Sequence, residues 1–505
     1  MDTSIHGLGE EIDAIVQGYE AILPGHEVEQ RVVETIARFL DGLRGANYSI
    51  EEVLVKSWEP IRANIELCGE TLEATPWPRC GDGYIEIEAV PIGLSEALSH
   101  SGSLAGYAIV APFTSPSSAR SLYSRLADRE PSSLILHSEH DNLLALTEKP
   151  FTITNLCATR TPVIHVATRL VERVKRCGRL RLIIQDKRFW ATSAILEAWN
   201  NHSGPVVLIA TSLDSLGSPR LWARSVSSAF TVFTLLTEQG IGARLVVLPA
   251  SMLGDPMHPG FLPGYGARIY SRVLKETTLG DTIALVLNID ANPVARKTTL
   301  LYPPFLGAAL SQPQGINNDY LWSNSAIFIS HGFPSAVASL GHGQALLSED
   351  SHLDIERLHE ILGLVINWRR LVSNCIEYFY SWVLEKPLPR LRNIVYKLRR
   401  VAEKALEENN YVNAISACRV LIEAGYRVND VVFNDSHMLD TVLFPPLGCF
   451  EQGYTECYDI LTGAAWRIGG EVDKPYIFMD NYLSEHLETV YEEYYMRGLL
   501  AKGSL

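Results

Sequence analysis

Between residues 180 and 340 the chain carries several short, nearly unbroken apolar segments, separated by stretches in which apolar residues recur at helical spacing. The segments include LRLIIQ, VVLIATS, ARLVVLP and TIALVLNID. A strand that is apolar on both sides must be covered on both sides, and parallel strands joined by helices meet that requirement. The pattern therefore predicts an α/β fold in which helices flank a largely parallel sheet.

Changes in pattern along the chain predict four parts. Apolar residues at helical spacing in residues 10–45 indicate two helices, whereas short β-like runs separated by turn residues begin near residue 82. Two further helical stretches near the carboxyl end meet at an Asn-Asn turn. The predicted parts are an N-terminal helical part (1–80), a β-rich module (81–180), an α/β domain (181–378) and a mainly helical C-terminal extension (379–505).

Within the α/β domain, each apolar segment is expected to form a strand of its own. LRLIIQ and SAILEAW read as two strands, and SAIFIS and FPSAVAS read as two later ones. Helices are expected at 221–239, near 264–277 and from about 353. The chemistry of such a sheet belongs in the loops beyond the carboxyl ends of its parallel strands.

Composition limits the class of protein. The 505 residues include 43 basic and 58 acidic ones, a net charge of −15, which argues against a surface for nucleic acid or for an anionic membrane. The amino terminus lacks the basic and apolar regions of a signal peptide, and no apolar run approaches the length of a membrane span. We therefore expect a soluble, cytoplasmic protein. The eight cysteines form no CxxC pair and are expected to be mostly buried as small apolar residues.

Four segments resemble, in order and spacing, those of the co-catalytic zinc aminopeptidases, the family that also includes glutamate carboxypeptidase, glutaminyl cyclase and the transferrin receptor. They are GPVVLIATSLDSLG, ARLVVLPASMLGD, TIALVLNID and SNSAIFISHGFPSAV. Upstream, the runs from GYAIVAPF to GRLRLIIQ are similar to the protease-associated domain that these enzymes commonly carry. The resemblance implies a zinc-aminopeptidase-like sheet with an inserted β-rich protease-associated-like domain and a helical C-terminal extension.

The resemblance also places the family's metal site on this sequence, where most of its residues are replaced. The first histidine ligand falls on Ser212, and Asp214, which orients that ligand in the family, is kept. The catalytic glutamate and the ligand beside it fall on Ser251 and Met252, which supply neither a base nor a charged ligand. Asp290 matches a family ligand and is kept.

The remaining family ligands are lost as well. The stretch that should hold the bridging aspartate, WARSVSSAF, contains no acid, and the later Asp-His pair has become Asn324 and Ser325. The last histidine falls near Leu346 or Leu347. Only one of about five ligand positions is kept, whereas a two-zinc site needs all of them and a free glutamate.

These replacements predict a non-catalytic homologue of a zinc aminopeptidase, with no catalytic residue and no cofactor. Such a protein would bind a peptide or protein ligand, or assemble as a homo-oligomer through its C-terminal helices. The alternative is an active metallo-aminopeptidase with a rebuilt zinc site. Asp255 and His258, in the loop after ARLVVLP, would then join Asp214 and Asp290, although turn residues of a surface loop are the favoured interpretation of that pair.

Other candidate residues carry weaker patterns. His342 and His352 bracket the lost final ligand, and either could replace it through a shifted loop. His331 is expected to be a packing or hydrogen-bonding residue of its loop rather than a ligand. The densest cluster of ligand types is LHSEHDN, for which an exposed polar loop is favoured over a metal site; it holds His137, Glu139, His140 and Asp141. The sequence contains neither a serine nucleophile elbow nor a phosphate-binding loop.

Overall fold

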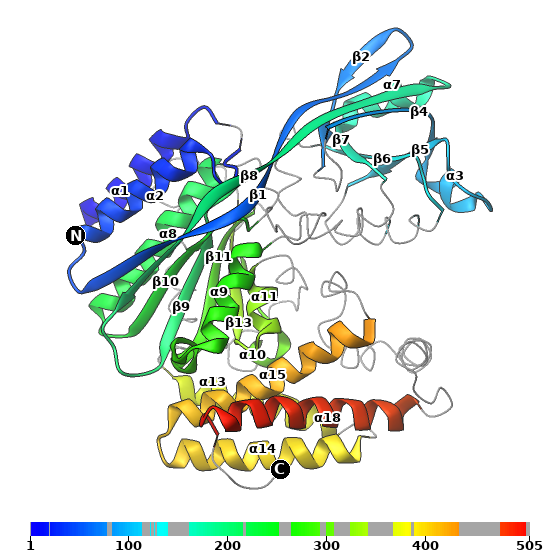
Figure 1. The fold of residues 1–505 in the computed structure, drawn as a ribbon. Coiled ribbons are helices and arrows are strands. Elements are labelled where there is room, and N and C mark those ends of the chain that lie inside the picture. The colour runs from blue at the N-terminus through cyan, green and yellow to red at the C-terminus, as the bar shows by residue number, and fades with distance from the viewer. Residues whose placement is uncertain are drawn as a thin grey trace.

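A computed structural model describes residues 2–19, 21–77, 83–113, 122, 126, 129–139, 161–215, 219–251, 264–292, 299–307, 324–341, 367–384, 388–433 and 475–500. Its strands form one large mixed sheet with helices on both faces, and a helical region follows at the carboxyl end (Figure 1). The predicted α/β fold class is confirmed. The domain boundaries remain predictions.

Four parallel strands make up the middle of the sheet. Their order is β13-β11-β9-β10, and antiparallel strands β12 and β8 lie at either side. The strand β9 is buried over its whole length, as its apolar sequence predicts. The bounds are β8 Leu180–Asn200, β9 Val206–Ser212, β10 Gly242–Leu248, β11 Ile283–Asn292, β12 Thr299–Leu301 and β13 Ser335–Gly341.

Helices cover both faces of these strands because successive side chains along each strand point to opposite sides. Val207 and Ile209 of β9 pack in the core that contains α1, α2 and α8, whereas Leu208 and Ala210 pack in the core that contains α9 and α11. The two predicted N-terminal helices are confirmed. The bounds are α1 Asp2–Val16, α2 Glu27–Asp41, α8 Pro219–Glu238, α9 Tyr265–Glu276, α10 Pro304–Gly307 and α11 Asn324–Ser330, with short 3₁₀ turns η2 at Thr168–Leu170 and η3 at Thr278–Thr282.

A long antiparallel ribbon connects this sheet to the β-rich part of the chain. Strand β1, of 22 residues, pairs along its length with β8, of 21 residues, and β8 then pairs with β4 (Figure 1). Beyond β4 the strands β5, β6 and β7 continue in parallel over cores of their own. The bounds are β1 Ala46–Leu67, β2 Glu70–Glu73, β3 Thr75–Pro76, β4 Gly83–Gly93, β5 Tyr107–Pro112, β6 Ser133–Ser138, β7 Val163–Ala167, α3 Leu94–Ser99 and α7 Val171–Arg176.

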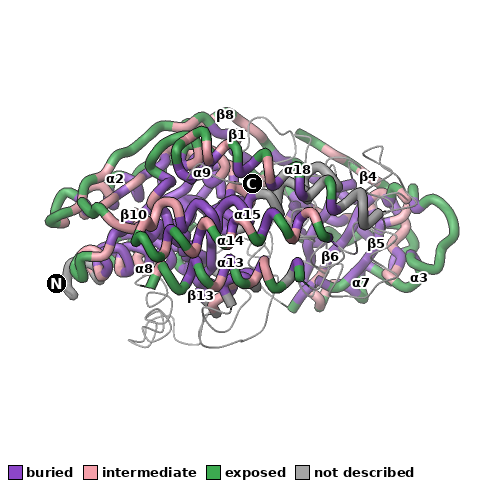
Figure 2. Tube along the Cα trace, turned by 90° about the horizontal axis from the view of Figure 1, so that it is seen from below, coloured by how far each residue is buried: buried purple, intermediate pink, exposed green. Residues whose placement is uncertain are grey.

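The C-terminal helices pack on one another and on the α/β part. Asp480 of α18 accepts the backbone N–H groups of Arg390 and Leu391, so α18 caps the first turn of α14. Burial is concentrated in the middle of the molecule, and the outer sides of the helices and much of the β1–β8 ribbon are exposed (Figure 2). The bounds are α13 Trp368–Leu384, α14 Pro389–Glu407, α15 Tyr411–Phe433 and α18 Pro475–Met496. None of the described helices has the length and hydropathy of a membrane span.

Three sequence predictions are wrong. Residues 46–76 were assigned to a helical part, but they form β1 to β3, because β1 finds a partner in β8 more than a hundred residues later. LRLIIQ and SAILEAW are one strand, β8, and not two. SAIFIS lies in helix α11, since a short apolar run fits a buried helix as well as a strand.

The cysteines also differ from expectation, because the four that lie in the described residues form disulfides. Cys68 pairs with Cys177 near the β-rich part, and Cys375 pairs with Cys418 between α13 and α15. Two disulfides are more typical of oxidising compartments than of the cytosol of most organisms. The cytoplasmic location stays a prediction.

Candidate functional site

Three of the predicted site residues meet at one edge of the sheet. Ser212 is the last residue of β9, Ser251 follows β10 by three residues, and Asp290 lies near the end of β11. The register pairs Ser212 with Leu248 and places Thr211 beside Ile289. Because these strands are parallel, their carboxyl ends form a common edge, where the sequence predicts the site.

Asp214 is buried, and its carboxylate holds the loop after β10. Its Oδ1 accepts a hydrogen bond from the backbone N–H of Ser251, with 2.7 Å between the two atoms. The preceding residue, Ala250, has a φ of +50°, a left-handed conformation that costs a residue with a Cβ about 1 kcal/mol. The charge-assisted bond offsets that strain, so Asp214 has a structural task in this loop.

Both the hydroxyl and the backbone carbonyl of Ser251 are hydrogen-bonded. Its hydroxyl donates to the carbonyl of Leu248 at 3.2 Å and accepts from Nδ2 of Asn324 at 3.1 Å, while its own carbonyl accepts the N–H of Gly264 at 2.8 Å. Gly264 has a φ of +72°, and a Cβ there would lie 2.0 Å from Cδ1 of Ile327. Ser251, on which the resemblance places the catalytic base, is thus the centre of a packed turn.

The other replaced positions are also used in packing. The carbonyl of Ser212 accepts a hydrogen bond from Nε1 of Trp222 at 2.6 Å. Ser325 turns toward β13, where its hydroxyl contacts that of Ser335 at 2.7 Å and the carbonyl of Ala336 at 3.1 Å. The hydroxyl of Ser325 is therefore directed at β13.

Asp290, the one retained ligand position, is 7% exposed and lies opposite Ser339 of β13. Among the described residues, no three His, Cys, Asp or Glu side chains come together as a metal site would require. Met252 and the candidate ligands Asp255 and His258 lie outside the described residues. The pairing of these two with Asp214 and Asp290 therefore stays a prediction.

Sequence reasoning missed Glu29, a buried carboxyl group of helix α2. Its Oε1 accepts from the hydroxyl of Ser193 at 2.7 Å, and its Oε2 accepts from the backbone N–H of Gly25. Burial raises the pKa of Glu29 to about 8, and the negative charge of Asp214 adds to the rise. The signal was its spacing from the apolar residues of α2, because Glu29 lies four residues before Val33 on the buried side.

Two of the remaining histidine candidates, His331 and His137, lie in the described residues. Nδ1 of His331 lies 2.9 Å from the carbonyl oxygen of Ile327, which confirms a hydrogen-bonding role in its loop. Nδ1 of His137 lies 3.2 Å from the hydroxyl of Thr168, and burial lowers the pKa of His137. Glu139, from the same cluster as His137, is exposed. The remaining members of these groups lie outside the described residues; they are His140, Asp141, His342, Leu346, Leu347 and His352.

Comparison with known proteins gives structural likeness at low identity. No family model and no curated protein matches the chain. An aminopeptidase from Aneurinibacillus sp. strain AM-1 is 14% identical, with a TM-score of 0.46 over 72% of this chain and 93% of that one. A peptidase M28 precursor from Shewanella amazonensis SB2B is 11% identical, with a TM-score of 0.49 over 73% and 96%.

A glutaminyl cyclase from an Acidobacteriales bacterium is 10% identical, with a TM-score of 0.24 over 36% of this chain and 74% of that one. At these identities and TM-scores the likeness does not decide what the chain does. The functional assignment rests on the residues at the carboxyl edge of the sheet.

Proposed function

We propose that this chain is a non-catalytic relative of the zinc aminopeptidases, which binds a peptide or protein ligand at the carboxyl edge of its sheet. One observation carries the proposal. Ser251, at the position of the catalytic base, has a hydroxyl that donates to Leu248 and accepts from Asn324. An alcohol engaged in this way cannot take a proton from water near neutral pH, as a carboxylate base does.

The described donor set does not fit a two-zinc centre. Such a centre needs carboxylate or imidazole ligands, one carboxylate bridging the two ions, and an open position for water. Asp214 is occupied with the amide of Ser251, and Ser325 contacts β13. Asp290 has the chemistry of a metal ligand, but the described residues contain no group of three His, Cys, Asp or Glu side chains that could hold a metal ion.

The same edge offers acceptors to a ligand with N–H groups. In the described structure the buried Oδ1 atoms of Asn324 and Asn288 have no hydrogen-bond partner. A buried carbonyl oxygen without a partner costs free energy until a donor reaches it. Peptide N–H groups would supply such donors, which supports a peptide or protein as the ligand at Asn324.

Two measurements test this proposal. The purified protein, supplied in turn with zinc, cobalt and manganese, should release no amino acid from a library of aminoacyl substrates. Fluorescence anisotropy with a labelled peptide library should select peptides whose binding weakens in Asn324→Ala and not in Glu51→Ala, an exposed control on β1. Metal-dependent release that is lost in Asp290→Asn or Asp255→Asn would instead establish the rebuilt peptidase site.

Assembly through the C-terminal helices is a separate part of the proposal. Light scattering on the full chain should give a mass of a dimer or larger. The helices α14 and α18 already contact each other, for example through Arg390 and Glu488 at 2.9 Å, so a partner would dock on the surface that these contacts leave exposed. A monomeric mass at high protein concentration would remove this part and leave ligand binding intact.

A further inference from the structure

A cavity of about 770 Å³ lies at the opposite edge of the sheet from the candidate site. It is bounded by α9, by the turn after α11 and by α18. The side chains from α9 are three and four residues apart, and so are those from α18, so each helix contributes one face. The turn with His331 lies just before β13, and Asp281, next to the cavity, lies just before β11. This is the amino edge of the parallel strands.

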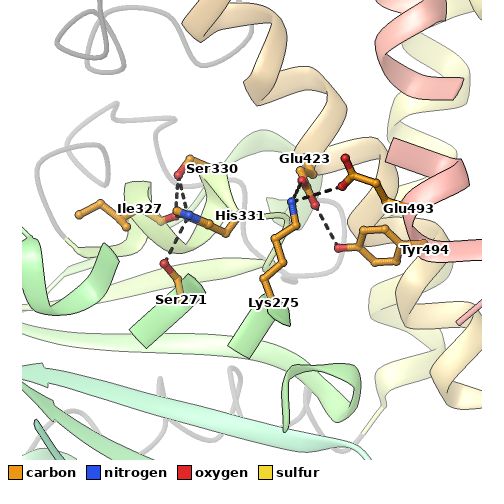
Figure 3. A network of polar contacts seen from close by, with 8 residues as sticks. All are labelled: Ser271, Lys275, Ile327, Ser330, His331, Glu423, Glu493 and Tyr494. Carbon is orange, nitrogen blue, oxygen red and sulfur yellow. Dashed lines mark hydrogen bonds and ion pairs between the residues drawn. The ribbon is translucent and has the colours of Figure 1, made fainter. Parts of the chain in front are cut away.

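The ring of His331 is held in one tautomer. Its Nδ1 lies 2.9 Å from the carbonyl oxygen of Ile327, which can only accept, so Nδ1 carries the proton (Figure 3). The hydroxyls of Ser271 and Ser330 each lie 3.2 Å from the same nitrogen. Burial lowers the pKa of His331, although Glu423 opposes that shift and Lys275 and Arg272 support it. The ring is therefore neutral near pH 7.

A neutral ring protonated at Nδ1 has its lone pair on Nε2. No residue in the described part of the chain makes a hydrogen bond with that nitrogen, and His331 lines the cavity. Nε2 is thus an acceptor available to a ligand. It is suited to an N–H or O–H donor and unsuited to a carboxylate.

Two of the cationic groups that line the cavity are neutralised within the protein. Lys275 pairs with Glu423 and lies 3.6 Å from Glu493, and the hydroxyl of Tyr494 donates to Glu423 at 3.2 Å (Figure 3). The guanidinium of Arg497 lies 2.8 Å from the carboxylate of Asp281. These contacts tie α9 and the start of β11 to α15 and the C-terminal helix α18. A ligand that binds to Lys275 or to Arg497 would have to compete with the carboxylates that already pair with them.

Three other lining residues keep their charges available. Arg272 and Glu276 of α9 and Glu492 of α18 make no ion pair with any described residue. Glu493 also lines the cavity and shares Lys275 with Glu423, so the lining holds more carboxylates than cationic groups. The cavity therefore presents the guanidinium of Arg272, an excess of carboxylates and the neutral acceptor of His331. Its volume is in the range of small-molecule sites.

We propose that this cavity binds a basic amino acid or a short peptide that carries one. The carboxylate of such a ligand would pair with Arg272, and its two cationic groups would pair with Glu276 and Glu492, with one of them also donating to Nε2 of His331. A ligand with one carboxylate and two cations suits a lining that holds the guanidinium of Arg272 and more carboxylates than cationic groups. A ligand with one charge of each sign would leave more of the carboxylate charge of this lining unneutralised. This inference does not depend on the candidate site or on its lack of catalysis.

Three probes separate the parts of this recognition: L-lysine, cadaverine, which lacks the carboxylate, and L-norleucine, which lacks the side-chain ammonium. Isothermal titration of the full chain should show that L-lysine binds most tightly. The loss of one charge-assisted contact should weaken binding about tenfold for each of the other two probes. Equal affinity for all three would contradict the proposal.

Variants assign the contacts. Arg272→Gln should weaken L-lysine about tenfold and leave cadaverine unchanged, whereas Glu492→Gln should weaken both. Lys404→Gln, an exposed change on α14, is the matched control and should alter neither. Circular dichroism and melting temperature establish that each variant is folded. Absence of L-lysine binding at millimolar concentration, or binding that is indifferent to both cavity variants, would overturn the inference.

Discussion

The carboxylate of Asp214 and the backbone N–H of Ser251 lie 2.7 Å apart, and this hydrogen bond joins the loops after β9 and β10. In the family that the sequence resembles, these positions orient a zinc ligand and hold the catalytic base. In this chain they stabilise each other. Asp214 therefore has a structural role in joining these two loops.

Asp214→Ala should destabilise the protein by about 2 kcal/mol, because the buried N–H of Ser251 loses a charged acceptor. Asp214→Asn, which keeps an acceptor oxygen, should cost less than half as much. Urea unfolding followed by tryptophan fluorescence measures both. If the alanine variant were as stable as the exposed control Glu51→Ala, the structural role of Asp214 would be disproved.

Glu29→Gln should stabilise the protein in a pH-dependent way. The pKa of this carboxyl group is about 8 in the fold and 4.5 in the unfolded chain, so the folded protein binds the extra proton between these values. Stability from this group is full below pH 4.5 and is lost as pH rises through 8. Glutamine does not ionise and avoids the loss, which is on the order of 3 kcal/mol at pH 7.

The difference in melting temperature between Glu29→Gln and the wild type should accordingly be near zero at pH 4.5 and largest above pH 8. Glu34→Gln, an exposed change on the same helix, should show no such trend. If the difference in melting temperature stayed constant with pH, the raised pKa of Glu29 would be disproved.

Gly264→Ala should lower stability more than Gly240→Ala. Both glycines have positive φ, +72° and +69°, but a Cβ at Gly240 meets open space, whereas one at Gly264 would lie 2.0 Å from Ile327. The left-handed backbone costs about 1 kcal/mol at either position. The excess loss at Gly264, measured by thermal unfolding, reports how tightly the turn of Ser251 is packed. Equal losses would mean that the turn yields easily.

Removal of the Cys375–Cys418 disulfide by serine at both positions should lower the melting temperature. A cross-link over 43 residues restricts the unfolded chain by about 4 kcal/mol in the chain-entropy account. Reducing agent should lower the melting temperature of the wild type further than that of the double variant. An identical response of the two proteins would show that this bond does not form in solution.

Sequence patterns predicted the central sheet well, because strands such as β9 and β11 are mostly apolar and the helices between them are amphipathic. They failed for β1, whose partner lies far along the chain, and for α11, whose apolar run is too short to show a period. Long-range pairing is absent from local sequence. That is also why the two disulfides were missed.

For the site, the sequence predicted that Ser212, Ser251 and Asp290 would meet at one edge, since parallel strands align their carboxyl ends. It could not predict that Ser251 and Asn324 bond to each other, nor that Ser325 turns toward β13. Glu29 was missed because it comes from α2, outside the segments that carry the resemblance. Side-chain direction and burial depend on packing that spacing does not encode.

The most direct test of the central claim is the metal content of the full chain, purified without chelator and measured by mass spectrometry after dialysis against zinc. The account predicts less than about one tenth of a zinc ion per chain, because the ligand set at the carboxyl edge of the sheet is incomplete. About two zinc ions per chain, reduced by Asp290→Asn, would contradict it and establish a rebuilt metal site.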